Sequence, residues 1–254
     1  MSERKAVIRT EKLCKSFVAG GIKHTIIDGL DLEIYEKDFT VIMGASGAGK
    51  STLLYALSGM DRASGGKILF CERDITRFTS DQLAIFRRRH CGFVFQQIHL
   101  VSSMSVMDNV LCAGLLTNQK RADLVRKAKQ MFQTVGITKE LWQKFPNQLS
   151  GGEAQRCGIV RALINTPDVV FADEPTGALN SASSDAVLNV LTEVNRQGQS
   201  IVMVTHDMKS ARRGSRILYL KDGRLIGECD LGPYEGETPE RTKKLSAFLE
   251  EMGW

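Results

Sequence analysis

The sequence predicts an α/β fold with a mostly parallel sheet core, an antiparallel β part and an inserted helical subdomain. After a first strand at 6–17, apolar and polar residues alternate over 26–35, as in half-buried antiparallel strands. Short apolar runs further along are separated by helical segments, which is the order that builds a parallel sheet. From about 103 to 165 the spacing is helical and no strand signal is present.

Composition is ordinary for a soluble globular protein. The 254 residues are enough for one large domain or two small ones, with 43% hydrophobic and 25% charged residues. No apolar run approaches the roughly 18 to 20 residues of a membrane span, and the start leads into no signal-peptide apolar region. We therefore expect a cytosolic chain that reaches a membrane only through a partner.

Charge and cysteine usage exclude few further classes. The net charge of +5 is mild, and its one dense basic run, 87–90, fits a solvated helix end better than a nucleic-acid or lipid contact. The six cysteines form no C-x-x-C pair and have no zinc-site spacing with histidine. We expect free, reduced and mostly buried thiols.

The elements in the first part of the chain are strands interrupted by two helices. A turn is predicted at 18–21, and Ser80 is a candidate cap for the second helix. The expected strands are 6–17, 26–35, 40–43, 67–71 and 92–95, and the expected helices are 52–57 and 80–89.

The later elements are three helices followed by strands that alternate with one more helix. Helices are expected at 106–116, 122–135, 154–164 and 184–196, and strands at 169–172, 201–204 and 217–220. We divide the single domain 1–254 into a core (1–96 and 166–227), a helical subdomain (97–165) and a tail (228–254). In the tail, Leu245, Phe248, Leu249 and Met252 share a helical face that docks on the domain or, less in keeping with the pattern, binds a partner.

A glycine-rich loop, Gly44–Ser51, lies between the strand at 40–43 and the helix at 52–57. It fits the pattern Gly, four free positions, Gly-Lys, then Ser or Thr. Its glycines let backbone N–H groups converge, and the helix begins with its positive dipole end at the same point. Lys50 adds a charge for the β- and γ-phosphates, and Ser51 a hydroxyl for Mg²⁺. A glycine-rich turn before a helix is the alternative, which this strand–loop–helix context disfavours. The predicted nucleotide-binding residues here are Gly44, Ser46, Gly47, Ala48, Gly49, Lys50, Ser51 and Thr52.

Two carboxylates, Asp173 and Glu174, follow the apolar strand at 169–172. In a parallel sheet the strand C-termini gather at the edge where the glycine-rich loop emerges, so Asp173 can reach a Mg²⁺ shell. Glu174 points elsewhere and can polarise a water in line with the γ-phosphate. The alternative, a pair of acidic residues capping the next turn, loses weight beside the glycine-rich loop.

The segment Ser150-Gly151-Gly152-Glu153 precedes the helix at 154–164. Ser150 and Glu153 fit a capping box. Two glycines in a first turn cost helix stability, and they suit close approach of an anion to bare N–H groups. The segment therefore has two interpretations, a helix cap and an anion site.

Taken in order, five motifs resemble the nucleotide-binding subunit of ATP-binding-cassette transporters over about residues 6–227. They are Gly44–Ser51, Gln96, Leu149–Glu153, Asp173-Glu174 and Thr205-His206-Asp207. The resemblance implies a RecA-like P-loop NTPase fold, ATP hydrolysis with Mg²⁺, and a head-to-tail homodimer. Each ATP would lie between Gly44–Ser51 of one subunit and Ser150–Glu153 of the other.

The resemblance also implies roles for single residues. Phe17 would stack on adenine, its alternative being a core aromatic at a strand end. Gln96 would contact Mg²⁺ or the attacking water and sense a membrane partner, with Gln97 as a weaker candidate. His206 would bind the γ-phosphate and position Glu174 and the water, whereas an isolated histidine at this place is more often a helix cap.

Two positions depart from the family pattern. Glu153 stands where Gln is usual, a familiar variant that changes little. Asn180, in Gly177-Ala178-Leu179-Asn180, stands where many relatives have Asp. Asn keeps the size and the acceptor oxygen of Asp but not its charge, in a loop that would cross the dimer interface.

Residues 94–101 and 172–179 are similar to one branch of the family, which includes macrolide-efflux, lipoprotein-release and bacitracin- or lantibiotic-resistance systems. This similarity implies a permease docked near Gln96 and the helical subdomain, on the cytoplasmic face of the membrane. Asn180 favours antimicrobial-peptide resistance or export over lipoprotein release or cell-division-type mechanotransmission. A soluble DNA-repair ATPase is a remote alternative, because the chain has no sustained heptad and no cysteine cluster, so no nucleic-acid partner is expected. The transported substrate is not encoded in this chain.

Overall fold

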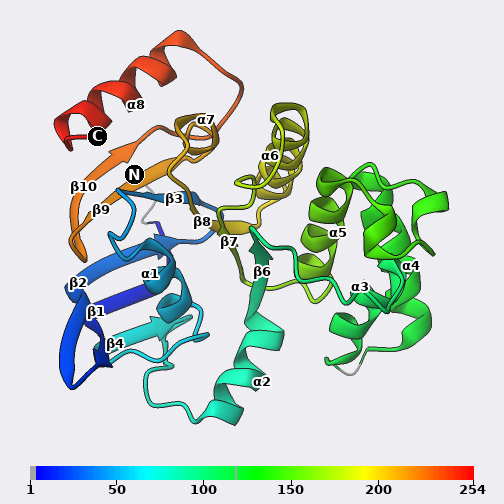
Figure 1. The fold of residues 1–254 in the computed structure, drawn as a ribbon, viewed down its shortest axis with the longest axis horizontal. Helices are drawn as coiled ribbons and strands as arrows, with labels where there is room; N and C mark the ends of the chain where they lie inside the picture. Colours follow the sequence, from blue (N-terminus) through cyan, green and yellow to red (C-terminus); the bar gives the residue numbers. More distant parts are fainter. Residues whose placement is uncertain (1–3, 118) are drawn as a thin grey trace. The chain divides into compact units, whose positions relative to one another are not determined.

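A computed structural model describes residues 4–117 and 119–254, which divide into two compact units (Figure 1). The first unit contains the described residues up to Ala84 together with Asn195–Trp254, and the second contains Ile85–Val194. Helix α2 (Ser80–His90) and helix α6 (Ser181–Arg196) each run through a boundary between these ranges. The α/β fold predicted from the sequence is confirmed.

An antiparallel sheet in the first unit has the strand order β2-β1-β4-β5. Its strands are β1 (Ala6–Ala19), β2 (Ile22–Tyr35), β4 (Gly65–Phe70) and β5 (Arg73–Asp74). The turn predicted at 18–21 is wrong at its first two residues, because β1 continues to Ala19. Only Gly20 and Gly21 form the turn, and both have positive φ, as a two-residue hairpin turn matched to the strand twist requires.

The second sheet region of this unit is mostly parallel. It contains β3 (Phe39–Met43), β8 (Ser200–Val204), β9 (Arg216–Lys221) and β10 (Arg224–Asp230), in the order β10-β9-β3-β8. Strand β3 runs parallel to both β8 and β9, and β10 pairs antiparallel with β9. Every residue of β3 and β8 is buried, which explains why both read as continuous apolar runs without alternation. Helix α1 (Lys50–Leu57) follows β3 after the glycine-rich loop.

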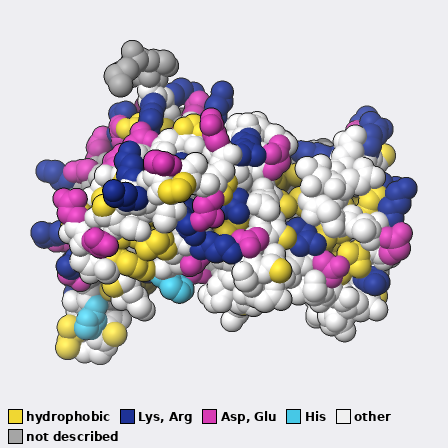
Figure 2. Space-filling view, turned by 90° about the horizontal axis from the view of Figure 1, so that it is seen from above, with side chains coloured by type: hydrophobic (Ala, Val, Ile, Leu, Met, Phe, Trp, Pro, Cys, Tyr) yellow, Lys and Arg dark blue, Asp and Glu magenta, His cyan; other side chains and the backbone are white. Residues whose placement is uncertain are grey.

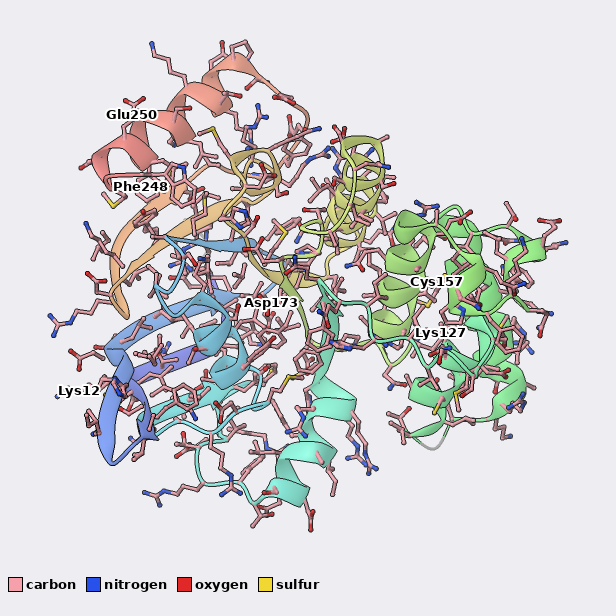
Figure 3. All side chains as sticks on the ribbon, viewed as in Figure 1. Lys12, Lys127, Cys157, Asp173, Phe248 and Glu250 are labelled. Atoms are coloured by element: carbon pink, nitrogen blue, oxygen red, sulfur yellow. The ribbon has the colours of Figure 1, made fainter. Side chains whose placement is uncertain are left out.

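The terminal helix α8 (Pro239–Glu251) docks on its own unit, the favoured one of its two interpretations (Figure 3). Leu245 and Leu249 are buried, and the ring of Phe248 contacts that of Tyr219 edge-on, with centroids 6.5 Å apart. The ring of Trp254 contacts Tyr219 in the same way at 6.2 Å. The helix thus covers the antiparallel pair β9–β10 with its apolar face.

The second unit pairs two parallel strands with a helical group. Strand β6 (Cys91–Phe95) runs beside β7 (Val169–Asp173). The three predicted helices are confirmed as α3 (Val106–Leu115), α4 (Arg121–Thr134) and α5 (Gly151–Leu163), with short 3-10 turns at Lys139–Leu141 and Pro146–Gln148. Phe132 and Trp142 stack in the core between these helices, their ring centroids 6.1 Å apart.

Two local predictions are wrong. The cap of α2 is Thr79 rather than Ser80: the Gln82 N–H donates to Thr79 Oγ1 at 3.2 Å, and the Thr79 N–H donates to Gln82 Oε1 at 2.8 Å. The second prediction concerns the cysteines. They are all free, as expected, but Cys71 and Cys112 are exposed. Burial of Cys157, by contrast, raises its pKa to about 12.

Charged side chains of both signs are interspersed on the face shown in Figure 2, in keeping with the mild net charge. The basic run 87–90 ends α2, where positive charge suits the helix dipole. Within residues 4–117 and 119–254, none of the helices has both the length and the apolar character of a membrane span.

We predict that Phe132→Ala lowers the free energy of unfolding by about 3–5 kcal/mol, because removing this fully buried ring leaves a cavity that its neighbours fill only in part. Urea denaturation measures this loss. The neighbouring exposed residue provides the control, and Gln133→Ala should change stability by no more than about 0.5 kcal/mol. A loss below about 1 kcal/mol for Phe132→Ala would contradict the described core.

Candidate functional site

The glycine-rich loop of the first unit has a backbone that only glycine allows at three positions. Gly44, Gly47 and Gly49 have φ of 149°, 82° and 97°. A Cβ on Gly44 would lie 2.1 Å from the carbonyl oxygen of Leu220, so no side chain fits there. Gly49 is the N-cap of α1 and supplies no capping side chain, which suits the helix start to an anionic ligand.

Lys50 lies buried under this loop. Its Nζ donates to the carbonyl oxygens of Gly44 at 2.8 Å and Ala45 at 2.9 Å. These bonds hold the ammonium beside the loop that bends around it. Ser46 and Gly47 are exposed and Ala48 is buried, while Ser51 and Thr52 are half-buried on the first turn of α1.

Phe17 and His206 also belong to the first unit. Phe17 is 45% exposed on β1, so it is not the core aromatic of the alternative interpretation. His206 follows β8 and is exposed. It is not the helix cap either, because Asp207 caps α7 (Met208–Ala211) by accepting from the N–H of Ser210 at 2.7 Å. Burial acts to raise the pKa of Asp207, but hydrogen bonds from Ser210 outweigh it and lower the pKa overall.

Asp173 and Glu174 lie on either side of the end of β7. Asp173 is the last residue of the strand (Figure 3). Glu174 has φ of 47°, a left-handed conformation that is costly for a residue other than glycine. The Gly177 N–H donates to the Glu174 carbonyl at 3.0 Å and closes a turn with Pro175 at its second position. Asp173 thus ends the strand, whereas Glu174 begins a strained turn.

Gln96 follows β6, whose last residue Phe95 pairs with Asp173 of β7. The Gln96 side chain lies against Gly177: a Cβ there would be 2.9 Å from Nε2 and 3.2 Å from Cδ. The structure therefore brings Gln96 to the turn that carries Glu174, all within the second unit. Gln97 is also exposed.

Helix α5 holds the end of β6 and the segment after it through residues that the sequence argument missed. Buried Gln155 donates from Nε2 to the Phe95 carbonyl at 2.9 Å. The Arg161 guanidinium donates to the carbonyls of Ile98 at 2.9 Å and His99 at 2.6 Å. The sequence signal for such a contact is a polar residue on the buried face of a helix, because a buried polar group needs a hydrogen-bond partner.

Ser150 and Glu153 form the predicted capping box at the start of α5. The Ser150 N–H and hydroxyl each donate to Glu153 Oε2 at 2.8 Å, and the Glu153 N–H donates to Ser150 Oγ at 3.3 Å. The cap interpretation is therefore confirmed. These two hydrogen bonds from Ser150, first from its backbone and then from its side chain, hold the pKa of Glu153 below its ordinary value of 4.5.

The paired glycines in this first turn have a packing reason that the sequence argument missed. A Cβ on Gly152 would lie 2.9 Å from Cβ and Oγ of Ser183, and one on Gly151 would lie 3.1 Å from Leu179 Cδ2. Asn180 starts α6 nearby, because its Oδ1 accepts from the Ser183 N–H at 2.9 Å. Helix α6 therefore begins before its predicted start at 184. Asn180, which stands where many relatives have Asp, still provides the cap.

The oxygen donors predicted for Mg²⁺ suit that ion. Ser51 supplies a hydroxyl in the first unit, and Asp173 and Gln96 supply a carboxylate and an amide in the second. Mg²⁺ prefers such hard donors and is usually held by few protein groups together with substrate phosphates. Across residues 4–117 and 119–254, no group of three or more His, Cys, Asp or Glu side chains is placed to hold a metal ion.

Comparison with known proteins gives one family. The family model for ABC transporters matches residues 27–177. The chain is 38% identical over 234 residues to the bacitracin export ATP-binding protein BceA of Halalkalibacterium halodurans, covering 92% of each chain. It is 40% identical over 222 residues to the macrolide export ATP-binding/permease protein MacB of Sodalis glossinidius, covering 87% of this chain and 34% of MacB. The chain thus spans about a third of the MacB relatives.

A solved structure has the same fold. A dimeric ATP-binding cassette in a post-hydrolysis state, bound to ADP and Pi, superposes with a TM-score of 0.82 at 32% identity. The match covers 89% of this chain and 100% of the other. It includes both units of the chain, and the neighbour is a nucleotide-bound dimer.

The capping box predicts an acid-dependent contribution to stability. Because the pKa of Glu153 is lowered on folding, its carboxylate stabilises the fold above the unfolded-state pKa. That stabilisation is lost as the pH falls through the folded-state pKa. Glu153→Gln should therefore show less loss of unfolding free energy between pH 7 and about pH 3.5 than the parent chain, measured by urea denaturation. Glu250→Gln, at an exposed position of α8, is the control and should retain the parent's dependence. Equal pH dependence in the parent and Glu153→Gln would contradict the prediction.

Proposed function

Because the chain belongs to the ABC transporter family, we propose that it is the ATPase subunit that powers a membrane permease for antimicrobial-peptide resistance or export. ATP binding and ATPase chemistry belong to this family's cassette. The observation that carries the proposal is buried Lys50, held beneath a loop whose glycines leave its backbone open to phosphates. Membership of the family and this local geometry point to the same substrate.

Hydrolysis is assigned to the chain's own groups as follows. Lys50 and the loop N–H groups stabilise charge on the β- and γ-phosphates as it develops. Glu174, whose backbone is left-handed, orients the attacking water and accepts its proton. His206 binds the γ-phosphate. Ser51, Asp173 and Gln96 would hold Mg²⁺, which neutralises phosphate charge when bound.

The proposed working form is a head-to-tail homodimer. Ser150 and Gly151 are exposed at the start of α5, where the N–H groups of a helix favour an anion. A second copy would place this start over the ATP held by Gly44–Ser51. The dimeric state of the nucleotide-bound neighbour supports this arrangement. Binding of ATP would shift the population toward the closed dimer, and release of phosphate would reverse it.

The proposed partner is an integral-membrane permease that docks near Gln96 and the helical subdomain 97–165. Five large apolar side chains of the second unit are exposed in this region, which favours a protein surface as their cover: Val101, Met104, Leu115, Leu116 and Phe145. The chain would then lie at the cytoplasmic face of the membrane. The name of the relative BceA supports a peptide antibiotic as the substrate class, in agreement with Asn180.

We predict that Glu174→Gln binds ATP but does not turn it over, and therefore accumulates as a closed dimer. Size-exclusion chromatography with Mg-ATP should show the mutant at twice the mass of the parent monomer. Lys50→Ala is the control: without its ammonium it should neither dimerise nor hydrolyse ATP. A Glu174→Gln variant that stays monomeric and hydrolyses ATP at the parent rate would refute the proposed site.

The contact of Gln96 with Gly177 predicts a variant that loses activity but not stability. Gly177 does not have positive φ, so its backbone accepts alanine, whereas the new Cβ would push the Gln96 amide aside. Gly177→Ala should lower the ATPase rate about tenfold, since small displacements of positioning groups are costly. Its unfolding free energy should change by about 0.5 kcal/mol or less.

The matched comparison for this variant is Gln96→Ala. If Gly177→Ala acts by displacing the amide, it should add no further loss of ATPase rate in the Gln96→Ala background. A further tenfold loss in the double variant would mean that Gly177 acts through another group.

A further inference from the structure

Lys15 is a buried lysine on the strand that carries Phe17. Only 7% of its surface is exposed, and it is the last buried residue of β1 before the strand becomes exposed. Residues two apart in a strand share a face, so Lys15 and Phe17 project to the same side of β1. An ammonium buried at this level is costly unless its donors are satisfied, and its partners therefore identify its role.

Two hydrogen bonds and one aromatic ring contact the ammonium of Lys15. Its Nζ donates to Asp61 Oδ1 at 2.7 Å and to the Arg62 carbonyl at 2.8 Å. It also lies over the ring of Phe17, 4.6 Å from the centroid. One face of the aromatic ring is thus covered by a cation, while the side chain as a whole stays 45% exposed.

The same contacts connect Phe17 to the phosphate-binding loop through α1. Asp61 follows this helix, and its N–H donates to the Tyr55 carbonyl at 3.0 Å. The next residues are bonded to β1, with the Ser64 N–H donating to the Cys14 carbonyl at 2.8 Å. Lys15 therefore fixes the ring of Phe17 to the far end of the helix that begins at Lys50.

We propose that Lys15 is a positioning residue for the nucleotide base: it holds the ring of Phe17 at a set place and polarises it for stacking. A cation on one face draws π-electron density toward itself, which makes the other face a better partner for an electron-rich purine. This proposal rests on the proposed function, which supplies the nucleotide. A purely structural lysine would join β1 to the segment after α1 and leave base stacking unaffected.

Binding of ADP and of pyrophosphate, measured by calorimetry with Mg²⁺, separates these roles. Pyrophosphate needs the phosphate-binding loop but has no base, and neither ligand is hydrolysed by an ATPase. Lys15→Met should weaken ADP binding about 3- to 10-fold, the range of one partly desolvated cation–π contact, and leave pyrophosphate affinity unchanged within about twofold. Phe17→Leu should weaken ADP binding at least as much. Lys15→Met should add nothing in the Phe17→Leu background.

Two further variants control for charge and folding. Lys23→Met removes the same charge from an exposed position on β2 and should leave both affinities unchanged. Lys15→Gln keeps N–H donors for Asp61 and Arg62 without the charge, and it replaces Lys15→Met if that variant does not fold. It should show the same selective loss of ADP affinity.

The outcomes distinguish this proposal from the proposed function. Equal weakening of ADP and pyrophosphate by Lys15→Met would show a structural role and overturn the proposal. Loss of ADP affinity that persists in the Phe17→Leu background would overturn it too, because Lys15 would not be acting through the ring. A parent chain that binds neither ligand would overturn the proposed function, and this proposal with it.

Discussion

The close approach of Gly44 to the Leu220 carbonyl is the constraint on which the first unit depends. Met43 pairs with Tyr219 at the end of β3, and the next residue must pass β9 with no side chain between the two backbones. The chain can then turn with left-handed glycines and begin α1 over a buried lysine. The nucleotide-facing geometry is therefore set by strand pairing in the sheet, and the loop inherits its position from the core.

A comparable constraint organises the second unit, where small residues allow three segments to meet. Gly152 receives Ser183, and Gly177 receives the Gln96 amide. Gln155 bonds α5 to the last carbonyl of β6, and Arg161 bonds it to carbonyls of the segment that follows. The start of α5, the turn after β7 and the segment after β6 thus pack as one body. A change at any one of them would be felt by the others, because packed interiors transmit displacement instead of absorbing it.

Features that depend on neighbours in sequence could be predicted from local patterns. Contacts between distant segments could not. The strand–loop–helix around Gly44–Ser51 and the capping box of Ser150 and Glu153 depend on neighbours in sequence, so periodicity and cap chemistry sufficed. Gly152 has no room for a side chain because Ser183 packs against it, and the partners of Lys15 lie in a segment beyond α1. Such pairings follow from tertiary packing, which propensity does not encode. The predicted cap of α2 is wrong for a local reason. Several hydroxyl residues are adjacent there, and only the backbone geometry selects Thr79.

The positions of the two tryptophans make the units optically distinct. Trp142 lies in the core of the second unit with 8% of its surface exposed, whereas Trp254, at the end of the first, is 44% exposed against Tyr219. An indole in an apolar core emits at shorter wavelength than one in contact with water. Replacing either tryptophan by Phe would leave a single indole that reports on one known unit. Comparing the two variants would then show whether the units unfold together, without any added label.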